Sequence, residues 1–135
     1  MAVKISVTVR NARLDAIETA IGVSAVLKIR VGAPPTNIAD ADSGTVLATM
    51  TLPSNWMADA ASGAKALTGT WQDASADAAG TAGHFRIYAS DGTTQHIQGT
   101  VTATGGGGDM TLDNAVIAAA QVVNVTTFTL TDGNA

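Results

Sequence analysis

Apolar and polar residues alternate most regularly in the segment Gly83–Ala103, where two runs flank an Asp-Gly pair. The apolar positions of each run share one face, which is typical of a half-buried antiparallel hairpin. They are Phe85, Ile87 and Ala89 in the first run, and Ile97, Gly99, Val101 and Ala103 in the second. Opposed residues face the same side of a sheet, so the pattern predicts Ile87 opposite Ile97 and Ser90 opposite Thr94, with a three-residue loop, Asp91–Thr93, between the strands.

A second pattern, with a period near 3.6, predicts an amphipathic helix over about residues 8–21. Its apolar stripe holds Val7, Leu14, Ile17 and Ile21, and Arg13, Asp15 and Glu18 are expected on the opposite side. Ser6 or Thr8 can cap the first turn with its hydroxyl. Gly22 can end the helix, because glycine adopts a positive φ without strain.

Short strands separated by Gly, Pro, Asn and Asp account for the rest of the chain. Val26–Val31 places Leu27, Ile29 and Val31 on one face and Lys28 and Arg30 on the other, before Gly32–Pro35 ends it. Further strands are predicted at Val46–Leu52, Leu67–Trp71, Met110–Ile117 and Val122–Thr131. In the last of these Val125 and Phe128 differ in parity, which predicts a β-bulge near Thr126–Thr127 or a bend.

Together these elements predict a mainly β fold, an antiparallel β-sandwich or open barrel of about seven strands with one N-terminal α-helix. No long linker or internal repeat divides the chain, so we interpret residues 1–135 as a single domain. Loops are expected at 34–44 and 71–83. The four-glycine run Gly105–Gly108 predicts a flexible connection between two strands.

Composition restricts the function further. Ala and Thr supply 45 of the 135 residues and aromatic residues only 4%, so we expect a thin core that gains stability from neighbouring subunits, the alternative being an ordinary β domain of low stability. Only 13% of residues are charged and the net charge is −4, which argues against binding to a phosphate backbone. The chain has no cysteine, no signal peptide after Lys4 and no apolar stretch long enough to span a membrane. We therefore expect a soluble protein made in a cytoplasm.

Candidate metal ligands are few. His84 and His96 both fall on the polar face of the hairpin, with His96 opposite Tyr88, so they lie about 13 Å apart and cannot share one ion. We interpret both as surface residues. Asp40–Gly44 begins like a calcium loop, but Thr51 stands where the twelfth-position glutamate is needed. Asp73 and Asp77 form a loose acidic pair, and a weak calcium site of another type is the alternative to solvated carboxylates.

Other candidate chemistry is equally weak. Gly105–Gly108 precedes Asp109, whose charge would repel a phosphate, and no serine lies in a Gly-x-Ser-x-Gly elbow. Trp56 and Trp71 could stack on a sugar or a base, but tryptophans more often serve in a core or an interface. The sequence therefore predicts no catalytic residue, no cofactor and no metal site.

Several motifs, in order along the chain, resemble a family of small virion proteins encoded by tailed phages and prophages. They are Arg10–Ala16 (RNARLDA), Leu27–Pro35 (LKIRVGAPP), Val46–Leu52 (VLATMTL), Ala79–Tyr88 (AGTAGHFRIY) followed by Asp91-Gly92, and Met110–Leu112 with Val125–Leu130 (VTTFTL). The resemblance covers nearly the whole chain. His84 stands where the family pattern has Trp, so the packing there is expected to differ.

This resemblance implies a non-enzymatic structural protein of the virion, whose partners are the major capsid protein or other virion proteins and neither nucleic acid nor a membrane. With the low charge and thin core it favours a capsid decoration (cement) protein, a homo-oligomer and preferably a trimer, bound at symmetry points of the head. The alternatives are a neck, collar or tail component, and a carbohydrate- or host-surface-binding module that would use exposed Trp56 or Trp71. An enzyme is the least favoured class.

Overall fold

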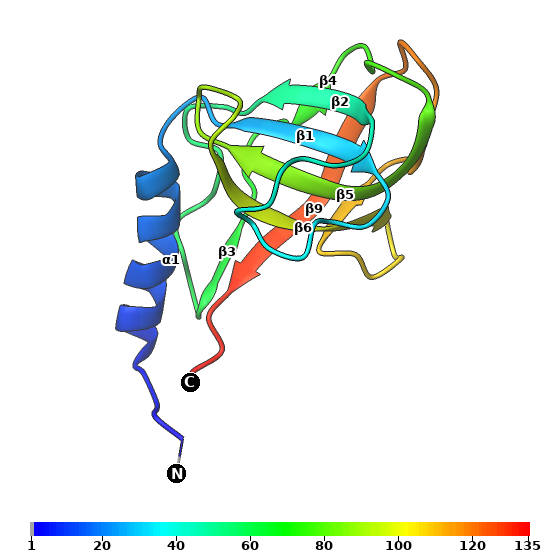
Figure 1. Ribbon diagram of the computed structural model, residues 1–135. Helices are drawn as coiled ribbons and strands as arrows, with labels where there is room; N and C mark the ends of the chain where they lie inside the picture. The colour runs from blue at the N-terminus through cyan, green and yellow to red at the C-terminus, as the bar shows by residue number, and fades with distance from the viewer. Residues whose placement is uncertain (1) are drawn as a thin grey trace.

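The computed structural model describes residues 2–135 as an N-terminal helix followed by a curled, mainly antiparallel sheet that forms a half-barrel (Figure 1). The predicted open barrel with one N-terminal helix is confirmed. The elements are α1 Val7–Ile21, β1 Val26–Val31, β2 Val46–Thr51, β3 Ala64–Ala66, β4 Gln72–Asp73, β5 Gly80–Tyr88, β6 Gln95–Ala103, β7 Met110–Leu112, β8 Val116–Ile117 and β9 Val123–Thr131. The strand order is β2-β1-β5-β6-β7-β9-β3, while β4 pairs with β9 and β8 with β5.

Helix α1 begins and ends where its local chemistry predicts. The Ser6 hydroxyl accepts a hydrogen bond from Val9 N, and Gly22 follows the last turn with a φ of 89°. The helix is 15 residues long. No helix in residues 2–135 combines the length and apolar character needed to cross a membrane.

The β5–β6 hairpin has the predicted register at its centre but a different turn. Ile87 lies opposite Ile97, as expected. Beyond it, the register shifts so that Tyr88 pairs with Gln95, and the predicted pairing of Tyr88 with His96 is wrong. The Ala89 amide donates to Thr94 O, which leaves four loop residues rather than three. The side chain of Asp91 accepts from the amides of Thr93 and Thr94 and so stabilises this longer turn.

A bulge in β9 reconciles its two parities. Met110 pairs with Phe128 and Thr111 with Thr127, but Leu112 pairs with Val125, so Thr126 is the extra residue. The predicted bulge near Thr126–Thr127 is confirmed. It allows Val125 and Phe128 to be buried on the same side of the strand.

The core contains four of the five aromatic residues of the chain. Trp56, Trp71, Phe128 and Phe85 follow one another with ring centroids 5.9, 5.6 and 5.4 Å apart, and Tyr88 is buried on the other face of β5. Each indole also donates a hydrogen bond to a backbone carbonyl, from Trp56 to Gly22 and from Trp71 to Trp56. The core is therefore more aromatic than the composition alone suggested.

Two predicted strands are divided or displaced. Leu67–Trp71 is not a strand, because Gly69 turns the chain at a φ of 70° and Trp71 enters the core, with β3 before this segment and β4 after it. Met110–Ile117 is two short strands, β7 and β8, rather than one.

The glycine run is a tightly packed connection. Residues 104–109 return the chain so that β7 lies parallel to β6, with Val101 beside Met110. A Cβ on Gly106 would lie 2.7 Å from the Thr102 side chain, and one on Gly108 would lie 2.8 Å from Thr102 N. The run connects two strands, as predicted, and Gly106 and Gly108 are in addition needed for the close approach to Thr102.

Replacing Gly83 with alanine should destabilise the fold, because a Cβ there would lie 2.7 Å from Gly32 N and 2.8 Å from Gly32 C. These are backbone atoms, so β5 or the loop after β1 must shift, and we expect the free energy of unfolding to fall by about 1–3 kcal/mol. Urea denaturation followed by tryptophan fluorescence measures this. Gly133→Ala is the control, since nothing lies within 4 Å of its Cβ position. Equal effects of the two substitutions would contradict the steric explanation.

Candidate functional site

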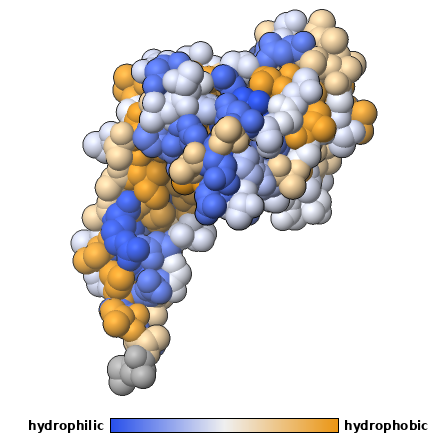
Figure 2. Space-filling model, viewed as in Figure 1, coloured by the Kyte–Doolittle hydropathy of each residue, from blue (hydrophilic) through white to orange (hydrophobic). Residues whose placement is uncertain are grey.

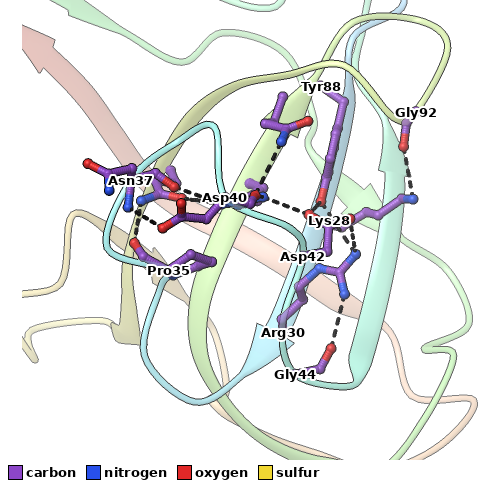
Figure 3. Close-up of polar contacts among 12 residues, drawn as sticks. Lys28, Arg30, Pro35, Asn37, Asp40, Asp42, Gly44, Tyr88 and Gly92 are labelled. Atoms are coloured by element: carbon purple, nitrogen blue, oxygen red, sulfur yellow. Dashed lines mark hydrogen bonds and ion pairs between the residues drawn. The ribbon is translucent and has the colours of Figure 1, made fainter.

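The outer face of the central strands carries a set of polar side chains that is covered rather than solvated. Antiparallel pairing of β1, β5 and β6 places these residues on one face. The loop 32–45 passes over this face, and Figure 3 shows its contacts with the strands. The set consists of Lys28, Arg30, His84, Arg86, Tyr88 and Gln98, and we call it the covered polar face.

Asp42 of the loop is the centre of this arrangement. Its Oδ2 accepts from Arg30 at 2.9 Å, and its Oδ1 accepts from the Tyr88 hydroxyl at 2.7 Å (Figure 3). Its Oδ1 also accepts from Arg86 at 2.9 Å. The Arg86 side chain is fully buried. One carboxylate therefore pairs with two guanidinium groups that the fold removes from water.

The loop backbone supplies the remaining partners. Arg86 donates to Asp40 O and Asn37 O, and Arg30 donates to Gly44 O. Gln98 accepts from Arg86 and donates to Pro35 O at 2.7 Å. Both arginines thus donate to a segment that has no secondary structure of its own, although the buried Nε of Arg30 has no partner within residues 2–135.

These contacts shift the pKa values of Asp42 and Tyr88. Burial alone would raise the pKa of Asp42, but the hydrogen bonds from Tyr88 and Arg86 and the charges of both arginines outweigh it and lower that pKa below 3.8. Burial, and the hydrogen bond to Asp42, raise the pKa of the Tyr88 hydroxyl above 10.0. Asp42 is therefore ionised and Tyr88 is a neutral donor at neutral pH.

The two histidines differ, and the interpretation of both as surface residues is wrong for His84. His96 is exposed, but His84 is completely buried and its Nδ1 lies 2.8 Å from Gly32 O. Since a carbonyl only accepts, Nδ1 carries the proton, and the buried Nε2 has no partner among the protein atoms. Burial, with the nearby charges of Arg30 and Arg86, lowers the pKa of His84 below 6.5.

A second polar cluster attaches α1 to the sheet. The amine of Lys65, a buried residue of β3, lies 2.7 Å from Asp15 and 3.0 Å from Glu18. The carboxylates of Asp15 and Glu18 also accept from the amides of Ala60 and Met57. The expectation that Asp15 and Glu18 lie opposite the packed side of the helix is therefore wrong. Both carboxylates face the sheet, where they bind the Lys65 amine and the two backbone amides.

The remaining candidates from the sequence also have internal partners. The calcium-like segment 40–44 presents the carboxylate of Asp42 to two arginines, which argues against a cation there. Asp73 and Asp77 do come together, but around Thr49. Asp73 accepts a hydrogen bond from the Thr49 amide, and Asp77 accepts one from the Thr49 hydroxyl. Within residues 2–135 no group of three or more metal-ligating side chains is found.

The tryptophans do not form a ligand-stacking surface. Trp56 and Trp71 are both buried in the core. The condition for the carbohydrate-binding alternative, an exposed tryptophan beside polar loops, is therefore not met.

Apolar side chains are exposed at the two ends of β9. The N-terminal arm, residues 2–9, exposes Val3, Val7 and Val9. At the other end the segment Val116–Val122, which comprises β8 and the loop that follows it, exposes both of its terminal valines. Figure 2 shows apolar surface along α1 and down to its N-terminal end. These are the surfaces on which another molecule could bury apolar area.

No protein-family model matches this chain, and searches of curated proteins and of solved structures return no match. The basis for a function is therefore the geometry together with the motif resemblance.

The arrangement holds a fold together and offers surfaces for association. Sequence reasoning missed the covered polar face, although its signal was present. Lys28 and Arg30 alternate with Leu27 and Ile29, and Arg86 lies between Phe85 and Ile87. Cations on the second face of a central strand need anionic or carbonyl partners if that face is covered, and a loop rich in Asp follows directly.

Asp42→Asn should destabilise the protein by about 3 kcal/mol, because it leaves two buried guanidinium groups without a counter-charge. This is the lower end of the usual range, since the Asp42 side chain is 36% exposed. Chemical denaturation measures the loss, and limited proteolysis should cut the loop 32–45 faster. Asp40→Asn is the control, because the Asp40 side chain accepts only from the Asn37 amide and makes no ion pair. A large loss from Asp40→Asn, or none from Asp42→Asn, would contradict the role of the charge.

Stability should also fall as the pH drops below 6.5, the ordinary pKa of histidine. There the unfolded chain binds a proton at His84 that the folded chain disfavours, so this part of the stability is present above pH 6.5 and lost below it. The free energy of unfolding, measured down to about pH 5 so that carboxylates stay ionised, should show this slope. His84→Gln should flatten it and His96→Gln should not. An unchanged slope in His84→Gln would show that another group is responsible.

Proposed function

We propose that this protein is a non-enzymatic structural component of a tailed-phage virion, and that it decorates and stabilises the head as a symmetric homo-oligomer. The major capsid protein is its partner in this proposal. The motif resemblance supports the class of protein, and the small size and low charge suit a subunit that neighbours partly cover.

The observation that supports the proposal is the placement of polar and apolar side chains: charged groups are buried and paired, and apolar groups are exposed. Arg30, Arg86 and Lys65 are buried and paired with carboxylates of the same chain. In contrast, the N-terminal arm carries Val3 with 81% of its surface exposed, together with Val7 and Val9. A chain that satisfies its charges internally and exposes apolar side chains on a projecting segment is suited to assembly rather than to chemistry on a small substrate.

The proposal competes with other places in a virion. A neck, collar or tail component would have the same fold and the same apolar arm, but it would occur in far fewer copies. The host-surface or carbohydrate-binding module is less favoured, because Trp56 and Trp71 are buried.

Quantitative mass spectrometry of purified virions that encode this chain tests the proposal. We expect hundreds of copies per particle, because decoration proteins repeat over the surface lattice of the head. A number near that of a single ring, about six or twelve, would overturn the head assignment in favour of a neck or tail component. Absence from the particle would overturn the virion assignment itself.

A further inference from the structure

The positive charge left on the surface is concentrated at the N-terminal end. Residues 2–13 contain Lys4, Arg10 and Arg13 and no acidic residue, whereas residues 14–135 contain four Lys or Arg against eleven Asp or Glu. Three of those four cations, Arg30, Lys65 and Arg86, are buried. The N-terminal arm, residues 2–9, therefore carries one cation, Lys4, and no acidic residue, on a body of net negative charge. The next two cations, Arg10 and Arg13, lie on α1 against Asp132.

The arm also projects away from the body. Figure 1 shows α1 beside β3 and the C-terminal segment, with the first turn and the preceding residues continuing beyond them. Leu14 and Ile21 of the helix are buried, but Val7, Thr8 and Val9 are all exposed. One contact holds the base of the arm, from the Ile5 amide to Asn134 O at 2.7 Å.

A surface of complementary character lies at the opposite end of β9. The segment Val116–Val122, β8 and the loop that follows it, exposes Val116, Val122 and the three alanines 118–120 between them. Asp113 precedes this loop, and hydrogen bonds between the loop and Ala76 place it beside the segment that carries Asp73 and Asp77. No Lys or Arg follows Arg86 in the chain. We call this apolar loop with its acidic neighbours the distal loop.

The arm cannot reach the distal loop of its own chain. β9 begins directly after the loop and ends beside α1, where Arg13 pairs with Asp132 at 3.2 Å. Nine strand residues separate the two surfaces, which corresponds to roughly 30 Å. Val3 lies four residues before Val7, the first residue of α1, so it reaches at most about 14 Å from the helix, and this segment points the other way.

We propose that the N-terminal arm of one copy binds the distal loop of a second copy. The contact opposes unlike charges and buries valines from both sides, whereas arm on arm or loop on loop would oppose like charges. This inference rests on the proposed function to the extent that it identifies the contact that forms the homo-oligomer. The contact joins two different surfaces, so the oligomer is closed when the arm of every copy is bound by another copy and every distal loop binds an arm.

Sedimentation velocity of the purified chain at high micromolar concentration tests the contact. Wild type should form oligomers, and Val3→Asp and Val116→Asp should each weaken association about tenfold or more. Both side chains are largely exposed, 81% and 65%, so the fold should tolerate the substitutions. Val23→Asp is the matched control, because Val23 is 64% exposed and lies outside both surfaces.

Mixing the two weakened variants gives the sharper result. The Val116→Asp chain keeps an intact arm and the Val3→Asp chain an intact loop, so an equimolar mixture should form a hetero-dimer that neither variant forms alone. A monomeric wild type, unchanged association of either variant, or a mixture that stays monomeric would overturn the proposal. Virions with hundreds of copies of a chain that is monomeric in solution would overturn this contact and leave the assignment to the head standing. Association that follows the expected pattern in solution, without any copies in virions, would support the contact and overturn the proposed function.

Discussion

The pairing of Asp42 with Arg30 and Arg86 is the constraint on which the rest of the sheet depends. The inner face of β1 and β5 packs on the aromatic core, and the outer face carries two arginines, a histidine and a tyrosine that are all buried. Burying such groups is unfavourable unless each finds a partner. The loop 32–45 provides those partners, and its close passage over β5 requires Gly83 to lack a side chain where it meets Gly32. The buried arginines, the path of the loop 32–45 and the glycine at position 83 therefore depend on one another.

Polar contacts also attach helix α1 to the body of the protein. The helix buries only Leu14 and Ile21, which is a small apolar contact for 15 residues. Polar side chains on the same side add to it by accepting from backbone amides of the segment 57–63: Asn11 from Gly63, Asp15 from Ala60 and Glu18 from Met57. Since these contacts involve the middle and end of the helix, its first turn remains exposed. Attachment by polar contacts is thus what leaves an apolar N-terminal end available for association.

Local patterns predicted much of this fold, and distant contacts account for what they missed. The bounds of α1 and β1, the pairing of Ile87 with Ile97 and the bulge at Thr126 follow from capping, period-two alternation and parity, which involve only neighbouring residues. The errors have a common cause. Asp15 and Glu18 turn inward because of Lys65, about 50 residues away in sequence, and His84 is buried because the chain returns over β5 at Gly32. The alternation of residues within a strand does not show whether another part of the chain covers its polar face.

This internal pairing also restricts how copies can meet. Because three of the seven cations are buried inside the fold, the exposed charge of the body is mainly acidic, whereas the arm carries only Lys4. An arm that binds a distal loop leaves one arm and one loop uncovered at the ends of any open chain of subunits, and those apolar ends favour closure. A closed oligomer leaves neither exposed, and its symmetry axis can coincide with an axis of a capsid lattice. In the proposed assembly, the charges that fix the loop over the sheet are thus kept away from the contact between copies.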